Sequence, residues 1–133
     1  MSARTVGNVT FDFIEPDILK YTWKGSTGEA EVIALQEYAE EMIRAHGPTQ
    51  FLLIDVREAG AIHPSARKRI GHLSKAQLWQ ATVIYGASFP VRVTIELIIN
   101  AAKIVQPNAT DTAFVADEPA ALAWLAGQRA KLK

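Results

Sequence analysis

The residue types with the most chemical potential in this sequence gather in one short stretch, residues 55–65, which follows an apolar segment. The stretch holds side chains that can accept a proton, bind an anion or accept a phosphoryl group: Asp55, Arg57, Glu58, His63 and Ser65. Ligands of open α/β sheets bind beyond the carboxyl ends of parallel strands. We therefore take Asp55, Arg57 and His63 as a candidate loop site. For Asp55 itself, accepting backbone N–H groups of the following turn is favoured over catalysis.

Ser65 opens an expected helix, and three roles compete for its hydroxyl. A hydroxyl at a helix start most often caps the free N–H groups there. A phosphate on Ser65 would instead meet those N–H groups, the positive end of the helix dipole and the basic side chains of Arg67 and Lys68. A nucleophile activated by His63 is disfavoured, because residues two apart in a turn rarely align and no nucleophile elbow is present. Ser65, Arg67 and Lys68 thus form a candidate phosphoacceptor or anion site.

Other catalytic arrangements are missing from the sequence. The chain has no Cys, which excludes disulfides, thiol nucleophiles and cysteine-based zinc sites. Its three His residues do not have metal-ligand spacing, and no glycine-rich phosphate loop is present. We therefore expect no metal, no cofactor and no enzymatic activity.

The composition describes an ordinary globular protein. Its 133 residues suit one domain spanning 1–133, and 49% of them are hydrophobic. Fourteen basic residues balance fourteen acidic ones, so no net charge attracts the chain to nucleic acid. No apolar run reaches the roughly 18–20 residues that span a bilayer, and no signal-peptide core opens the sequence. We expect a cytoplasmic protein without a transmembrane segment.

The pattern of apolar residues predicts the elements that position these side chains. Alternation predicts strands over 9–15 and 18–24, joined as an antiparallel hairpin. Continuous apolar runs predict buried strands over 51–54 and 81–87, with a short last strand over 112–116.

Four helices are expected between and after these strands. The first follows a capping box at residues 26–29 and ends at His46, and the second begins at Pro64. The third spans 91–105, and the fourth is capped by Asp117. The order β-β-α-β-α-β-α-β-α predicts an α/β fold with a mixed four- to five-stranded sheet and about four helices.

The expected helix over 91–105 is apolar nearly all the way round, so it should be buried on more than one side. One side would face the sheet. The other would be covered by the C-terminal helix, by an apolar ligand or by a second subunit. For a homodimer, the candidate interface residues are Val91, Ile95, Ile98 and Ile99.

The order of elements and two motifs resemble the STAS domain of bacterial anti-sigma-factor antagonists. In those proteins a strand ending in Asp precedes Asp-Ser-Ser-Gly at a helix start, and the second Ser is a phosphorylation switch. Here Phe51-Leu52-Leu53-Ile54-Asp55 matches the strand, and the switch position falls on Ser65. The local sequence His63-Pro64-Ser65-Ala66 lacks the leading Asp, the first Ser and the Gly.

A closer resemblance is to the SpoIIAA-like branch, also named STAS/SEC14, over roughly residues 6–127. The segment Asp117-Glu118-Pro119-Ala120-Ala121-Leu122-Ala123-Trp124-Leu125 matches its C-terminal helix. The resemblance implies a SpoIIAA-like fold and a regulatory domain that binds a protein, such as an anti-sigma factor or kinase-like partner, or itself. An apolar, lipid-like ligand is an alternative implied by the SEC14 part of the name, and a phosphoregulated switch at Ser65 is another.

Overall fold

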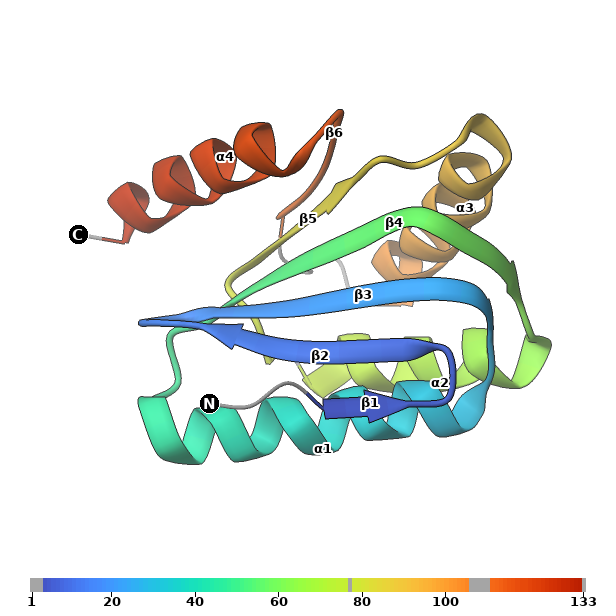
Figure 1. The fold of residues 1–133 in the computed structure, drawn as a ribbon, viewed down its shortest axis with the longest axis horizontal. Helices are drawn as coiled ribbons and strands as arrows, with labels where there is room; N and C mark the ends of the chain where they lie inside the picture. Colours follow the sequence, from blue (N-terminus) through green and yellow to red (C-terminus); the bar gives the residue numbers. More distant parts are fainter. Residues whose placement is uncertain (1–3, 77, 106–110, 133) are drawn as a thin grey trace.

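The computed structural model describes residues 4–76, 78–105 and 111–132. In these residues the strands form one sheet and lie side by side in chain order, β1-β2-β3-β4-β5-β6 (Figure 1). β1–β3 pair antiparallel, and β3–β6 pair parallel. The strands are β1 (Arg4–Val6), β2 (Val9–Ile14), β3 (Ile18–Thr27), β4 (Phe51–Ile62), β5 (Ala81–Tyr85) and β6 (Asp111–Val115). The predicted mixed α/β sheet is confirmed, with six strands in the described residues instead of four or five.

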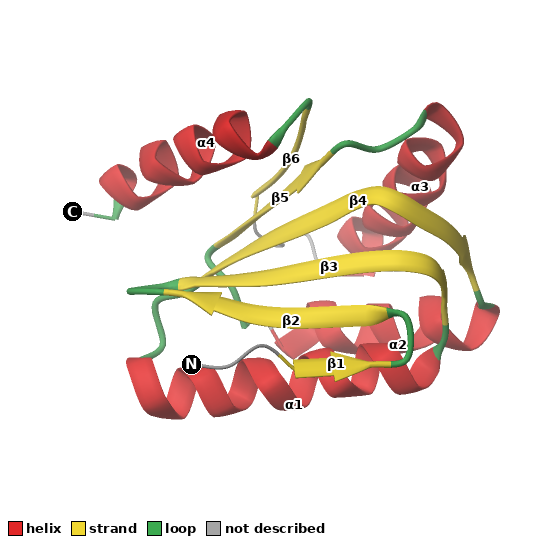
Figure 2. Cartoon of the chain, viewed as in Figure 1, coloured by secondary structure: helices red, strands yellow, loops and turns green. Residues whose placement is uncertain are grey.

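Four helices in the described residues connect and cover these strands (Figure 2). They are α1 (Glu29–His46), α2 (Pro64–Ala76), α3 (Phe89–Val105) and α4 (Glu118–Lys131). Successive strand residues point to opposite faces of the sheet. Leu52 and Val56 of β4 therefore pack in one core with α1, α2 and α3, whereas Phe51 and Leu53 pack in a second core with Leu125 of α4.

The start of α1 differs from the expected one. The capping box was expected at residues 26–29, but β3 continues to Thr27. The N-cap is Gly28, whose backbone N–H donates to the Glu31 Oε1 at 2.6 Å. The N-cap is therefore Gly28 instead of Ser26, two residues later than expected, because Ser26 belongs to β3.

The starts of the other helices follow the sequence more closely. Pro64 is the first residue of α2, as predicted. Asp117 caps α4, since its Oδ1 accepts the Ala120 backbone N–H at 3.0 Å. α3 begins at Phe89, two residues before the predicted boundary.

The largest difference concerns β4, which is a long strand where a loop was expected after Asp55. It pairs with β3 as far as Ile62, through Lys24 opposite Glu58 and Gly25 opposite Ala59. The register shifts at two places, and at each β4 contributes one residue more than β3. These bulges interrupt the alternation of side chains, so the segment does not have the sequence pattern of a strand.

No helix in the described ranges is both long and apolar enough to cross a membrane.

Candidate functional site

A network of charged side chains lies on the sheet face that carries α4, and Asp55 is its centre. Asp55 stands opposite Thr22 of β3 and Tyr85 of β5. It is only 4% exposed, although it follows an apolar strand segment and would be charged at neutral pH. A buried carboxylate of this kind requires hydrogen-bonding partners.

Asp55 has such partners on both of its oxygens. The Arg57 Nη2 donates to Oδ2 at 2.8 Å, and the Arg57 Nε donates to Oδ1 at 3.1 Å. The Arg57 backbone N–H also donates to Oδ1, at 3.0 Å. The Tyr85 hydroxyl donates to Oδ2 at 2.9 Å. Arg57 thus holds Asp55 in a two-pronged contact, the strongest arrangement that these groups form.

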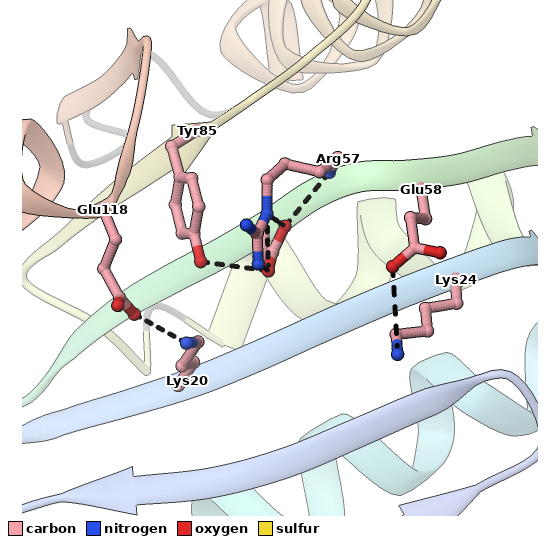
Figure 3. A network of polar contacts seen from close by, with 7 residues as sticks. Lys20, Lys24, Arg57, Glu58, Tyr85 and Glu118 are labelled. Carbon is pink, nitrogen blue, oxygen red and sulfur yellow. Dashed lines mark hydrogen bonds and ion pairs between the residues drawn. The ribbon is translucent and has the colours of Figure 1, made fainter.

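Two further ion pairs extend the network across the sheet (Figure 3). The Lys20 Nζ on β3 lies 2.6 Å from the Glu118 Oε2 at the start of α4. The Lys24 Nζ, also on β3, lies 3.8 Å from the Glu58 Oε2 on β4. The first pair ties the beginning of α4 to the sheet beside Tyr85.

These contacts shift the pKa values of the groups. Burial raises the pKa of Asp55, but the hydrogen bonds from Arg57 and Tyr85 outweigh it and hold that pKa below its ordinary value. Burial and the Asp55 carboxylate both raise the pKa of the Tyr85 hydroxyl. Burial lowers the pKa of Lys20, yet the contacts with Glu118 and Tyr85 leave it raised. Asp55 therefore stays ionised across the neutral range, while Tyr85 and Lys20 keep their protons.

The backbone shapes the site through a bulge and a glycine. The first bulge of β4 lies between Asp55 and Glu58, and it leaves Arg57 free to turn back over Asp55. The Arg57 guanidinium lies 5.5 Å from the centre of the Tyr85 ring. Gly86 has a φ of 77°, and a Cβ at this position would overlap the Arg57 side chain. Only glycine combines that backbone angle with room for Arg57.

Chemically, the network is a set of matched charges. Each carboxylate of the site faces a cation: Asp55 faces Arg57, Glu58 faces Lys24 and Glu118 faces Lys20. Asp55 is poorly suited to act as a general base, because its pKa is lowered and both of its oxygens accept hydrogen bonds. Among the described residues, no group of three or more His, Asp or Glu side chains could hold a metal ion.

The structure separates the candidate loop site into two places. Asp55 and Arg57 are in contact, but His63 lies at the far end of β4. Its backbone N–H donates to the Thr27 carbonyl at 3.0 Å. Strand residues advance about 3.3 Å each, so His63 cannot reach the Asp55 carboxylate. The expected cluster depended on a compact loop, and the long strand replaces that loop.

The candidate anion site lies at the start of α2. Ser65, Arg67 and Lys68 are all exposed there. The Arg67 backbone N–H donates to the His63 carbonyl at 3.1 Å, so the helix begins directly after His63. Lys68, three residues after Ser65, is its neighbour on the helix surface, whereas Arg67 points to another side.

The four candidate interface residues of α3 face the body of the protein. Val91, Ile95, Ile98 and Ile99 are half-buried and pack against the first core. The exposed side of α3 carries a different set of large apolar side chains, which we name the α3 row: Phe89, Val93, Leu97 and Ile104.

Sequence reasoning missed Tyr85, Lys20 and Glu118. The alternation over 18–24 does place Lys20 on the face opposite Leu19, which was a usable signal. Tyr85 had no such signal, because a continuous apolar run does not show which face each residue occupies.

The contribution of Asp55 to stability should depend on pH. We expect Asp55→Asn to lower the free energy of unfolding by about 1.5 kcal/mol at pH 7, because the amide is a weaker partner for Arg57 and Tyr85. The folded-state pKa of Asp55 lies below the ordinary value of 3.8, so its contribution is present above that pH. It is lost as the pH falls through the folded pKa.

Urea unfolding of both proteins from pH 7 down to pH 3 measures this difference. Asp12→Asn is the matched control, because among the described residues the Asp12 carboxylate accepts a hydrogen bond from the backbone N–H of its neighbour Phe13 alone. A gap between wild type and Asp55→Asn that stays constant with pH would contradict the lowered pKa.

Comparisons with known proteins place the fold. No protein-family model matches this sequence, and no curated protein matches it. Among solved structures, the chain is similar to an uncharacterized protein of the DUF3478 family from Shewanella loihica PV-4, which has a SpoIIAA-like fold. The sequences are 19% identical, the match covers 94% of this chain and 98% of that one, and the TM-score is 0.64. A likeness at this identity shows the fold alone, and it confirms the SpoIIAA-like fold that the resemblance implied.

Proposed function

We propose that this SpoIIAA-like domain is a regulatory protein-binding module with no catalytic activity of its own, and that it binds its partner through the α3 row. The proposal rests on one observation, the exposure of the apolar side chains of the α3 row. Phe89 is 79% exposed, Leu97 is 65% exposed and Ile104 is 83% exposed. Exposed apolar residues are common singly, but a contiguous apolar patch marks an interaction surface.

The members of the α3 row share one side of the helix. With 3.6 residues per turn, Phe89, Val93, Leu97 and Ile104 fall within an arc of roughly 80°. The residues that pack on the core lie on the opposite side. The row therefore forms an apolar strip over Phe89, Val93 and Leu97, and the exposed Asn100 separates it from Ile104 on the same side of the helix.

The shape and rim of the strip favour a protein partner over a small apolar ligand. Pockets for small molecules are concave and surround most of the ligand. The outer side of a helix is convex and cannot do so, but it can enter an apolar groove of another protein. Arg92 and Glu96 flank the row as an exposed ion pair of 2.8 Å, and polar rims of this kind are typical of protein interfaces.

Ser65 offers a second regulatory element within the same proposal. Its hydroxyl is exposed at the first turn of α2, and Lys68 lies one turn further along the helix surface. A phosphate there would be stabilised by the helix N-terminus and by that cation. Phosphorylation would then add negative charge to α2, which packs on the same core as α3.

Site-specific photo-crosslinking in the cells of origin tests the proposal. With a benzophenone amino acid in place of Leu97, we expect one discrete adduct that disappears when Phe89→Glu is added. Phe89→Glu should stay folded, because substitutions at such exposed positions change stability by only about 0.5 kcal/mol. In the control protein the crosslinking amino acid replaces Arg67, an exposed residue of α2. An adduct that is as strong at Arg67, or that survives Phe89→Glu, would refute binding through the α3 row.

A further inference from the structure

The outer edge of β6 lies at the end of the sheet, away from the α3 row. β6 pairs with β5 on one side, and no described residue pairs with its other side. Its sequence, Asp-Thr-Ala-Phe-Val, has one charge at the start and none after it. Open edges of this kind pair readily with other strands.

The opposite edge of the sheet differs sharply. β1 has three residues, and its Arg4 side chain reaches to α1, where it pairs with Glu41 at 2.5 and 3.2 Å. The Arg4 guanidinium also lies 5.0 Å from the centre of the Tyr38 ring. Shortness and charge are the usual protections of an edge strand. β1 has both, whereas among the described residues β6 has only the charge of Asp111 at its start.

The direction of the backbone groups in β6 follows from one hydrogen bond. The Gly86 N–H donates to the Val115 carbonyl at 3.3 Å, so the polar groups of Val115 point to β5. Successive residues of a strand alternate in this respect, so Ala113 also points its polar groups to β5. Thr112 and Phe114 then turn their N–H and C=O groups to the open edge.

We propose that β6 pairs antiparallel with β6 of a second copy of this chain, with Ala113 on the two-fold axis. This register places Thr112 opposite Phe114 of the partner, and Phe114 opposite Thr112 of the partner. Each outward N–H and C=O group of Thr112 and Phe114 then has a partner, which gives four new hydrogen bonds. The register is complementary to itself, as a two-fold interface must be.

The side chains fit the same register. Ala113 faces its own copy as a non-hydrogen-bonded pair, where Cα atoms approach to about 4.5 Å and side chains must be small. Asp111 faces Val115, so no like charges meet. Phe114 packs with the first core, on the side where Arg92 of α3 lies 4.9 Å from its ring centre.

Two strands of five residues do not by themselves bury the roughly 800 Å² per partner that a stable dimer needs. α4, which packs against β5 and β6 on one face of the sheet, would supply the rest. Figure 1 shows α4 next to β6 in the view, so this helical layer would continue into the second copy.

A single cysteine tests the register directly, because the chain contains no other. Ala113→Cys should form a disulfide-linked dimer under mild oxidation, since the expected Cα separation of about 4.5 Å lies in the range that a disulfide spans. The control is Ser65→Cys, an exposed position on α2. We expect Ala113→Cys to crosslink at least about tenfold faster than Ser65→Cys at the same protein concentration.

Sedimentation equilibrium of the full chain tests the hydrogen bonds. Thr112→Pro removes an outward N–H and leaves the bonds to β5, so it should weaken self-association about 10- to 30-fold. Thr112→Val retains that N–H and should associate as the wild type does. If Thr112→Pro does not fold, the Ala113→Cys comparison decides alone.

A chain that stays monomeric up to about 100 μM, at which even weak specific dimers form, would overturn the proposal. Equal crosslinking of the two cysteine variants would do the same. Phe89→Glu should leave the β6 dimer intact, so the two interaction surfaces are tested separately.

Discussion

Replacing Leu125 with alanine should lower the free energy of unfolding by about 3 kcal/mol, roughly twice the loss expected for Asp55→Asn. Leu125 is fully buried between α4 and the sheet, in the core that contains Phe51 and Leu53. Its truncation removes apolar contacts and leaves a cavity that α4 alone cannot close. Urea unfolding followed by circular dichroism measures the loss.

The same helix provides the matched control. Leu122 lies three residues earlier in α4 and is 38% exposed. Leu122→Ala should cost less than about 1 kcal/mol, because much of that side chain already contacts water. Equal losses at the two positions would mean that α4 does not pack on the sheet through Leu125.

The second large effect is expected at Gly86. Gly86→Ala should lower the free energy of unfolding by about 2 kcal/mol, since a residue with a Cβ is strained at a φ of 77°. The new methyl group would also displace the Arg57 side chain from its place over Asp55. The substitution therefore weakens the backbone turn and the charged network together.

A glycine in α2 is the control for Gly86. A Cβ at Gly71 meets no atom within 4 Å, and the position lies inside a helix. Gly71→Ala should therefore raise the free energy of unfolding by about 0.5–1 kcal/mol. The strain assigned to the Gly86 turn would be wrong if Gly86→Ala were as stable as the wild type.

Much of the fold could be predicted from the sequence, because apolar spacing reports burial directly. Alternation over 9–15 and continuous runs such as 51–54 identify strands that are buried on one face or on both. Asp117 could be recognised as a helix cap because capping is local chemistry. Features that arise between distant segments were not visible in this way. The bulges of β4 depend on its pairing with β3, and no pattern within residues 55–62 records that pairing.

The candidate site shows the same difference between contacts within one segment and contacts between distant segments. Asp55 and Arg57 are two residues apart, and their contact could be anticipated from sequence proximity. Tyr85 belongs to another strand, so its approach to Asp55 needed the sheet register. Lys20 meets Glu118 of α4 from a third strand, which the local sequence does not show either. On α3, the sequence shows which residues share a side. It does not show which side meets the core, because the helix is apolar nearly all the way round.

The order of the strands across the sheet bears on how the chain is built. Each strand lies beside the strand that precedes it in sequence, from β1 to β6. During synthesis, every new strand can therefore be added at the edge of the sheet already formed, and none has to insert between two paired strands. Contacts close in sequence favour rapid folding. A partly made sheet of this order extends at its growing edge, and β6 holds that edge when the described strands are complete.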